Sequence, residues 1–166
     1  VIVATVLYVL TQKFNGGVAK NSFKILDVLS VLTPIGLGLG RIANFINMEV
    51  MGRETSSGFG VVFAGGQYIP RHPSPIYEAT LEGLVLFIIM WLLYTNTNLK
   101  RFPGANGGLF CVFYACFRAF CELFRQPDAQ IGFLTSWHLT MGQMLSGIMF
   151  VVGIVVLTCA LRKSKK

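Results

Sequence analysis

The stretch GRIANFINMEVMGRE, residues 40–54, directly follows the apolar run VLSVLTPIGLGL of residues 28–39. Arg41, Asn44 and Asn47 therefore lie at or within the end of a segment that has the composition of a membrane span. An ionisable residue in such a segment indicates a functional site, because its desolvation must be offset by a partner or a ligand. On a helix, Arg41 and Asn44 share a face, with Asn47 close to it. The alternative is a capped helix end from which the arginine extends to the interface. The polar residues that follow favour the first interpretation.

The composition is that of a membrane protein. Of the 166 residues, 54% are hydrophobic and 13% are charged, whereas about a quarter of the residues of an ordinary soluble domain are charged. The length fits a single membrane domain, residues 1–166. Because the apolar run of residues 1–10 begins abruptly and without a methionine, we expect this domain to be truncated at its N-terminus. The net charge of +7 is interpreted as topology rather than nucleic-acid binding, since the basic residues do not cluster with interleaved aromatic residues.

Apolar segments recur along the whole chain. They cover residues 1–10, 25–46, 76–94, 107–124 and 139–161. The last four approach or exceed the ~20 residues that cross a bilayer as a helix. The sequence therefore predicts an all-α polytopic membrane protein, a bundle of about five transmembrane segments.

The basic residues predict the orientation of these segments. Nine of the fourteen lie in the first loop, the third loop and the C-terminal tail: Lys13, Lys20, Lys24, Lys100, Arg101, Arg162, Lys163, Lys165 and Lys166. The positive-inside rule places these regions in the cytoplasm. The loops of residues 47–75 and 126–137 then face outward. Residues 47–75, which are rich in glycine around a short β-branched stretch, are predicted to form a small irregular or β-containing cap.

The five remaining basic residues are all arginine: Arg41, Arg53, Arg71, Arg118 and Arg125. Arginine presents a planar fork of donors that binds phosphate or carboxylate and stays charged when desolvated. This bias predicts an anionic ligand on the outer side, although pairing with nearby glutamates is an alternative.

Complementary charge is available in the same outer region. Arg118, Glu122 and Arg125 recur at i, i+4 and i+7, and Glu78 and Glu82 recur at i, i+4, so each group shares one helical face. Together with Arg41 these residues predict a polar cavity in the outer leaflet. A purely structural ion-pair network is the alternative.

The cysteines predict neither a metal site nor a disulfide framework. They stand at positions 111, 116, 121 and 159, without a Cys-x-x-Cys motif and without a shared helical face. Packing as small apolar residues is the favoured interpretation.

Four blocks of the sequence carry a family resemblance. They are GRIANFINMEVMGR at residues 40–53, HPSPIYEATLEG at 72–83, RAFCELFRQPDAQ at 118–130 and MGQ at 141–143. In this order they resemble the bacterial prolipoprotein diacylglyceryl transferases, and FRQPDAQ is the most specific part. Met48, Met51 and Pro75 depart from the usual family residues. The family's amino-terminal half, with a tyrosine and a His-Gly-Gly motif that has been proposed to supply a base, is expected to precede Val1.

The resemblance implies a transferase that moves a diacylglyceryl group from phosphatidylglycerol to the lipobox cysteine thiol of a prolipoprotein. A thioether forms and glycerol phosphate leaves. It also implies a seven-helix fold in the bacterial inner membrane, of which this chain is a fragment, with the active site toward the periplasmic leaflet. The implied partners are phosphatidylglycerol, the lipobox segment and the bilayer, with no nucleic acid and no cofactor.

The resemblance also implies roles for individual residues. Arg41 and Arg118 match the family's essential arginines, and Asn44, Glu49, Gly52 and Glu122 match its supporting site residues. With the charge pattern, this predicts catalytic roles for Arg41, Arg118 and Glu122, and substrate binding by Arg41, Asn44, Asn47, Glu49, Gly52, Arg53, Glu78 and Arg125.

Two other classes of membrane protein also place charges within a bundle. A transporter or channel subunit is expected to spread them along a pore across both leaflets. A structural subunit is expected to tolerate swaps of its paired charges. The concentration of charge near the outer segment ends favours the transferase.

Overall fold

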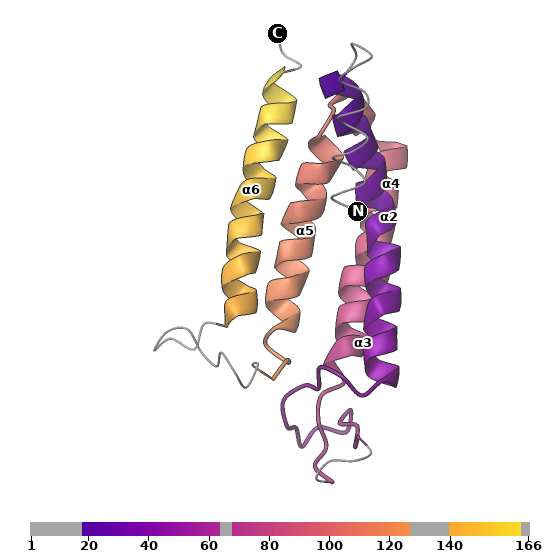
Figure 1. The fold of residues 1–166 in the computed structure, drawn as a ribbon, viewed down its shortest axis with the longest axis vertical. Coiled ribbons are helices and arrows are strands. Elements are labelled where there is room, and N and C mark those ends of the chain that lie inside the picture. The colour runs from indigo at the N-terminus through magenta and orange to yellow at the C-terminus, as the bar shows by residue number, and fades with distance from the viewer. Residues whose placement is uncertain (1–17, 64–67, 127–139, 164–166) are drawn as a thin grey trace.

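The computed structural model describes residues 18–63, 68–126 and 140–163, and Figure 1 shows their arrangement. In chain order the elements are α2 (Val18–Ile46), α3 (Ser74–Glu78), the π-helix η1 (Ala79–Val85), α4 (Leu86–Asn96), the 3-10 helix η2 (Asn98–Arg101), α5 (Ala105–Cys121) and α6 (Met141–Lys163). The α3, η1 and α4 elements follow one another without a break and form one rod from Ser74 to Asn96. The described chain is therefore a bundle of four rods.

Three of these rods are long and apolar enough to cross a membrane: Phe23–Ile46, Ser74–Asn96 and Met141–Arg162. The fourth, α5, is apolar but has 17 residues. Large apolar side chains such as Leu39, Ile46 and Val151 are more than half exposed, as expected when lipid rather than water surrounds them. The chain is a mostly helical membrane protein. Four of the five predicted segments coincide with these rods, and the prediction for residues 1–10 lies outside the described residues.

The rods pack side by side with alternating directions (Figure 1). The α2 and α5 helices run the same way, whereas the Ser74–Asn96 rod and α6 run the opposite way. The core that joins α2, the Ser74–Asn96 rod and α5 contains Val31, Leu86 and Met90, with aromatic residues of α4 and α5 packed against it. The parallel direction of α2 and α5 matters for the site, because both carry an arginine toward the same end.

The segment from residue 47 to residue 73, which we call the cap, extends beyond the end of α2 and the start of α3 (Figure 1). In its described part it contains no strand, and isolated bridges pair Gly52 with Arg125, and Arg71 with both Glu54 and Val61. It is thus an irregular cap with β-type pairing. The predicted boundary at residue 75 was two residues too late, since α3 begins at Ser74.

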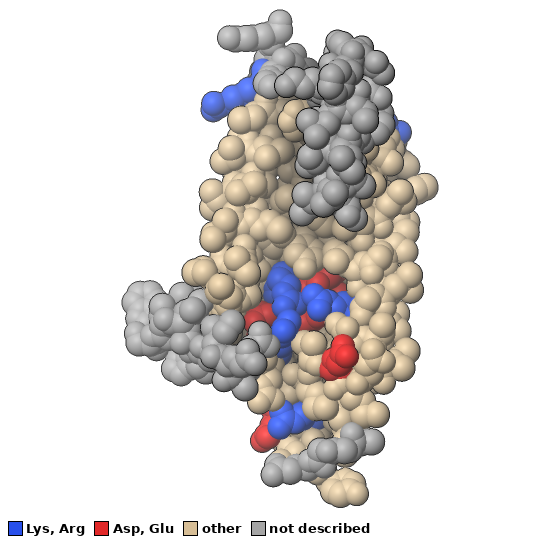
Figure 2. Space-filling view, in the orientation of Figure 1, with Lys and Arg blue, Asp and Glu red and all other residues tan. Residues whose placement is uncertain are grey.

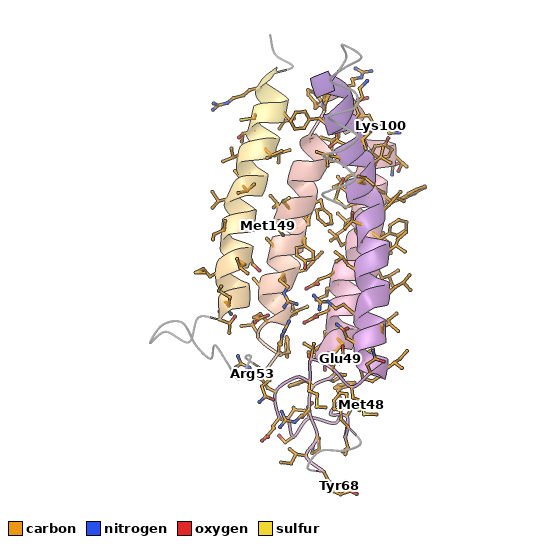
Figure 3. All side chains as sticks on the ribbon, in the orientation of Figure 1. Met48, Glu49, Arg53, Tyr68, Lys100 and Met149 are labelled. Carbon is orange, nitrogen blue, oxygen red and sulfur yellow. The ribbon has the colours of Figure 1, made fainter. Side chains whose placement is uncertain are left out.

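Apart from Arg125, which follows α5 at the cap end, the described basic residues outside this cap and the charged site lie at the other end of the bundle. Figure 3 shows Lys100 there, far from Glu49, Arg53 and Tyr68 in the cap. Lys24 lies in the N-terminal part of α2, and Arg162 is the second-last residue of α6, so both lie toward the same end. Lys13, Lys165 and Lys166, and most of the predicted outer loop 126–137, lie outside the described residues.

Candidate active site

Five charged side chains meet between α2, the Ser74–Asn96 rod and α5. Arg41 Nε lies 2.9 Å from Glu78 Oε2, and Arg118 Nη1 lies 3.0 Å from Glu78 Oε1. Glu82 lies farther away, at 3.6 Å from Arg41 Nη2 and 3.5 Å from Arg118 Nη1. Arg118 Nη2 also reaches Glu122 Oε2 at 3.2 Å. We call these five side chains the charged cluster.

The charged cluster is largely buried but not sealed. The side chains of Glu78 and Glu82 have no exposed surface, whereas those of Arg41 and Arg118 are 19% and 13% exposed. Figure 2 shows basic and acidic atoms together in a hollow of one face of the bundle. The arginines thus cover the glutamates and present part of their own surface outward.

The contacts within the charged cluster are close charge pairs rather than well-directed hydrogen bonds. Among the described residues, none of the four carboxylate oxygens of Glu78 and Glu82 receives a hydrogen bond of good geometry. Each guanidinium is shared between two or three carboxylates instead of forming a bidentate pair with one. Two oxygens of a phosphate can accept the paired N–H groups of a planar guanidinium, a bidentate contact that these arginines lack here.

A buried aspartate at the far end of the bundle joins α2 to the start of α5. The Asp27 carboxylate, on α2, accepts hydrogen bonds from the backbone N–H groups of Gly104 at 2.8 Å and Gly107 at 3.0 Å, at the start of α5. Fourteen residues separate Asp27 from Arg41, and fourteen separate Gly104 from Arg118. Because the two helices run the same way, each arginine lies about 21 Å along its helix from this contact. Both arginines therefore reach the same depth.

A close contact of two glycines brings the glutamates to the arginines. A Cβ atom added to Gly83 would lie 2.7 Å from the Cα atom of Gly38, so α2 and η1 touch through their backbones. Gly38 precedes Arg41 by three residues, and Gly83 follows Glu82 directly. The π-helix η1, a rare element that is frequent at functional sites, carries Glu82. This contact explains how Arg41 reaches two carboxylates on the neighbouring rod.

The start of α6 supports Glu122. Thr140 and Gln143 form a reciprocal capping box, in which each backbone N–H donates to the other side chain, at 3.3 and 3.2 Å. A Cβ atom added to Gly142 would lie 2.7 Å from the atoms of the Glu122 carboxylate. The carboxylate therefore rests on the first turn of α6, where the helix dipole stabilises negative charge.

The chain leaves α2 through a strained turn. The backbone N–H of Asn47 donates to Ala43 and that of Glu49 to Asn44, while Met48 and Val50 both have φ of 57°. This conformation is unusual for a β-branched residue. It is held in place by Ser74, whose hydroxyl donates to the Val50 carbonyl at 3.1 Å. Asn44 lies one turn beyond Arg41, and Asn47 and Glu49 are exposed at the cap side.

A second junction ties this turn to the end of α5. Gly52 N–H donates to the His72 carbonyl at 3.1 Å, and Arg53 N–H donates to the Phe124 carbonyl at 2.9 Å. The Arg53 side chain donates to the Arg125 carbonyl at 2.9 Å. A Cβ atom on Gly52 would lie 2.2 Å from the His72 carbonyl oxygen. Only glycine fits there, which gives Gly52 a packing role.

The chain is similar to known proteins over most of its length. The sequence model of the prolipoprotein diacylglyceryl transferases matches residues 1–159. The chain belongs to the prolipoprotein diacylglyceryl transferase family. The resemblance found in the four sequence blocks is thereby confirmed.

Curated relatives agree with this assignment. Three of them, each named phosphatidylglycerol--prolipoprotein diacylglyceryl transferase, come from Rickettsia typhi, Rickettsia akari and Pasteurella multocida. Their identities to this chain are 46%, 47% and 42%, over 88%, 92% and 95% of the chain. The matches cover 54%, 56% and 58% of the relatives. The chain thus spans about half the length of the curated relatives it matches.

The structure brings together four of the residues that the sequence singled out: Arg41, Glu78, Arg118 and Glu122. Asn44 lies near the end of α2, and Asn47 and Glu49 lie in the turn that follows it. The second junction is formed by Gly52, Arg53 and Arg125. In the described part of the chain no group of three His, Cys, Asp or Glu side chains suits a metal ion.

Sequence reasoning left three functional candidates out of the predicted site. Glu82 was recognised as a partner of Glu78 at i, i+4 and as part of the predicted polar cavity, but no catalytic or binding role was predicted for it. Tyr114, one turn before Arg118, lies against Arg41 and faces Glu82. Asp27 is a single carboxylate early in an apolar run. For each the available signal was a polar group in a membrane span.

A separate apolar pocket of about 470 Å³ lies beside the cap. It is lined by Ser57, Phe59, His72, Tyr77, Thr80, Leu81, Phe120 and Phe124. His72 Nδ1 and the Tyr77 hydroxyl lie 3.3 Å apart within an aromatic cluster around Phe124. The pocket residues that lie on helices are different from the five residues of the charged cluster.

Proposed function

We propose that this chain carries the phosphate-binding core of a transferase that moves a diacylglyceryl group from phosphatidylglycerol to a prolipoprotein cysteine. Family membership and the printed names of the relatives support this proposal. The observation that carries it is the pair of guanidiniums held level and partly desolvated around Glu78. Such a pair suits an anionic lipid headgroup at the depth of a bilayer leaflet.

The reaction class explains why two arginines are needed. The cysteine sulfur attacks the glyceryl carbon that bears the phosphate oxygen, a C–S bond forms, and the C–O bond breaks. The electron pair of that bond stays on the oxygen, so glycerol phosphate leaves and the phosphate gains one negative charge. Donors fixed in advance where this charge develops lower the barrier without reorganisation. Arg41 and Arg118 supply these donors.

The other predicted residues have supporting roles in this proposal. Glu122 orients Arg118 from the start of α6, and Glu78 spaces the two guanidiniums. Asn44, Asn47, Glu49, Arg53 and Arg125 contribute polar groups along the approach from the cap. Gly52 acts indirectly, by allowing the turn and the end of α5 to meet.

The proposed location is the bacterial inner membrane. Lys24, Lys100, Arg101 and Arg162 would face the cytoplasm, and the cap of residues 47–73 would face the periplasm. The charged cluster, near the cap end (Figure 2), would then open in the periplasmic leaflet. Phosphatidylglycerol reaches it from the bilayer, and the lipobox segment of the prolipoprotein delivers the thiol.

A transporter or channel subunit is not favoured. Its charges are expected at several depths along a pore, whereas the intramembrane arginines of the described residues share one level and one set of carboxylates.

The decisive experiment reconstitutes the full-length protein in vesicles that contain phosphatidylglycerol and adds a lipobox peptide. We expect the peptide to gain a diacylglyceryl thioether, detected by mass spectrometry, with release of glycerol phosphate. A peptide with serine in place of the cysteine, and vesicles of phosphatidylethanolamine alone, are the controls. Absence of transfer to the cysteine peptide would contradict the proposal.

A further inference from the structure

Glu82 differs from the other two carboxylates of the charged cluster. Its oxygens lie 3.5 and 3.6 Å from the nearest guanidinium nitrogens, whereas those of Glu78 lie at 2.9 and 3.0 Å. Glu122 is held by Arg118 at 3.2 Å and by the first turn of α6. Glu82 is therefore the buried carboxylate that the positive groups hold least closely.

The net charge of the charged cluster places a second constraint on the reaction. Two guanidiniums face three carboxylates, so the five side chains carry one net negative charge when all are ionised. A phosphodiester brings another negative charge, and its conversion to a phosphomonoester brings a third. In a site without bulk water, charge that accumulates in this way is costly. A proton taken up within the charged cluster offsets it.

We propose that Glu82 accepts the proton of the lipobox thiol, an assignment that rests on the function proposed above. A nearby positive charge opposes protonation of a carboxylate more strongly the closer it lies. Glu82 is thus better suited to take the proton than Glu78. Because the thiolate is the nucleophilic form of cysteine, the acceptor must lie within the site that holds the phosphate.

The step balances in atoms and in charge. The Glu82 carboxylate takes the proton from sulfur, the sulfur electron pair forms the C–S bond, and the electron pair of the C–O bond stays on the phosphate oxygen. Glu82 loses one negative charge while the phosphate gains one, so the total charge of the site is unchanged. Protonated Glu82 no longer attracts Arg41 and Arg118, whereas the closer contacts of both guanidiniums with Glu78 remain.

Other groups near the site are less suited to this role. Glu78 separates the two arginines, and its protonation would weaken both of the closest ion pairs. His72 bonds to Tyr77 in the apolar pocket, which is lined by Thr80 and Leu81 rather than by the glutamates. The groups that face Glu82 from the packed elements are Arg41 on α2, Glu78 on α3, and Tyr114, Arg118 and Cys121 on α5.

The test compares two nucleophiles in the full-length protein. Glu82→Gln keeps the shape of the side chain and removes the proton acceptor. With the cysteine lipobox peptide, we expect the single-turnover rate to fall by about 100-fold or more, the usual contribution of a general base. With a selenocysteine peptide, whose selenol is already ionised at neutral pH, we expect the loss to shrink to less than about tenfold. Glu54→Gln, at an exposed carboxylate of the cap, is the matched control and should leave both rates unchanged.

A second readout separates a base from a positioning residue. Glu82→Gln removes one negative charge next to the arginines. The phosphatidylglycerol fraction that gives the half-maximal rate should therefore stay the same or fall. If Glu82→Gln does not fold, Glu82→Asp, which retains a displaced carboxylate, should slow the cysteine peptide more than the selenocysteine peptide. Equal loss with both nucleophiles, or no loss with cysteine, would overturn the assignment to Glu82. Failure of the unaltered protein to modify the cysteine peptide would instead refute the proposed function, and this assignment with it.

Discussion

Removal of the Asp27 carboxylate should disturb the site from the opposite end of the bundle. This side chain is 4% exposed and accepts two backbone N–H groups at the start of α5. A hydrogen bond to a charged group contributes about 1.5 to 3 kcal/mol. Asp27→Ala, which leaves a buried donor on Gly104 and a partly buried donor on Gly107 unpaired, should therefore lower the free energy of unfolding by about 3 to 6 kcal/mol. Asp27→Asn keeps one acceptor and should lose about half of this.

The same change should reduce activity although Asp27 lies about 21 Å from Arg41. A slip of α5 by one residue moves Arg118 by about 1.5 Å along the axis and turns it by about 100°. Its 3.0 Å contact with Glu78 cannot survive that change. We therefore expect transfer by Asp27→Ala to fall by at least tenfold, at temperatures where the protein remains folded.

Thermal unfolding in detergent and the transfer assay measure the two effects. Ser30→Ala is the matched control, because the Ser30 hydroxyl donates to the Asp27 carbonyl within α2, at 2.7 Å, and so does not join α2 to α5. It should change stability by about 1 kcal/mol or less and leave activity intact. An Asp27→Ala protein that unfolds more easily but keeps full specific activity would refute the idea that this contact sets the level of the arginines.

Three further predictions concern the site and the orientation. Arg41→Lys and Arg118→Lys should each lose most transfer activity while the protein still folds, since lysine keeps the charge but not the fork; full activity in either variant would disprove the phosphate-binding role. Gly52→Ala should destabilise the protein by about 1 to 3 kcal/mol through overpacking, whereas Gly58→Ala, with open space around its Cβ, should melt like the unaltered protein; equal melting temperatures would show that the junction can relax. In a cysteine-free background, a cysteine at Gly58 should react with an impermeant maleimide from the periplasmic side and one at Lys100 should not, and the reverse result would invert the proposed topology.

The sequence was most informative where hydropathy alone sets the outcome. The rods of the bundle coincide with apolar segments predicted from composition, because burial in lipid requires about 20 apolar residues in a row. Helix ends were predicted less well. The prediction began the second segment at residue 25, whereas α2 begins at Val18. Polar residues that leave the membrane can continue a helix, and hydropathy does not detect them.

The site was predictable as a set of charges but not as a set of contacts. Arg41, Glu78, Arg118 and Glu122 were identified from their positions near the outer ends of their segments. Their partners depend on Gly38 and Gly83 touching and on Asp27 binding α5, two contacts between residues far apart in sequence. The cap had the same difficulty, since its backbone pairs join residues such as Arg53 and Phe124. No local propensity specifies pairs of this kind.

Burial of the charged cluster is costly to the stability of the fold. This cost is itself an argument that the charged cluster serves a function. Buried ion pairs rarely stabilise a protein more than apolar residues of the same size, because desolvation offsets their attraction. Here an unequal set of three carboxylates and two guanidiniums is buried with few well-directed hydrogen bonds among them. Three separate contacts, at Asp27, at Gly38 with Gly83, and at Gly52, hold the surrounding elements in place. A bundle shaped by stability alone would not retain charges that need such support. A site that must bind one anionic group and accept one proton requires an excess of carboxylate beside a pair of arginines, and these five side chains provide it.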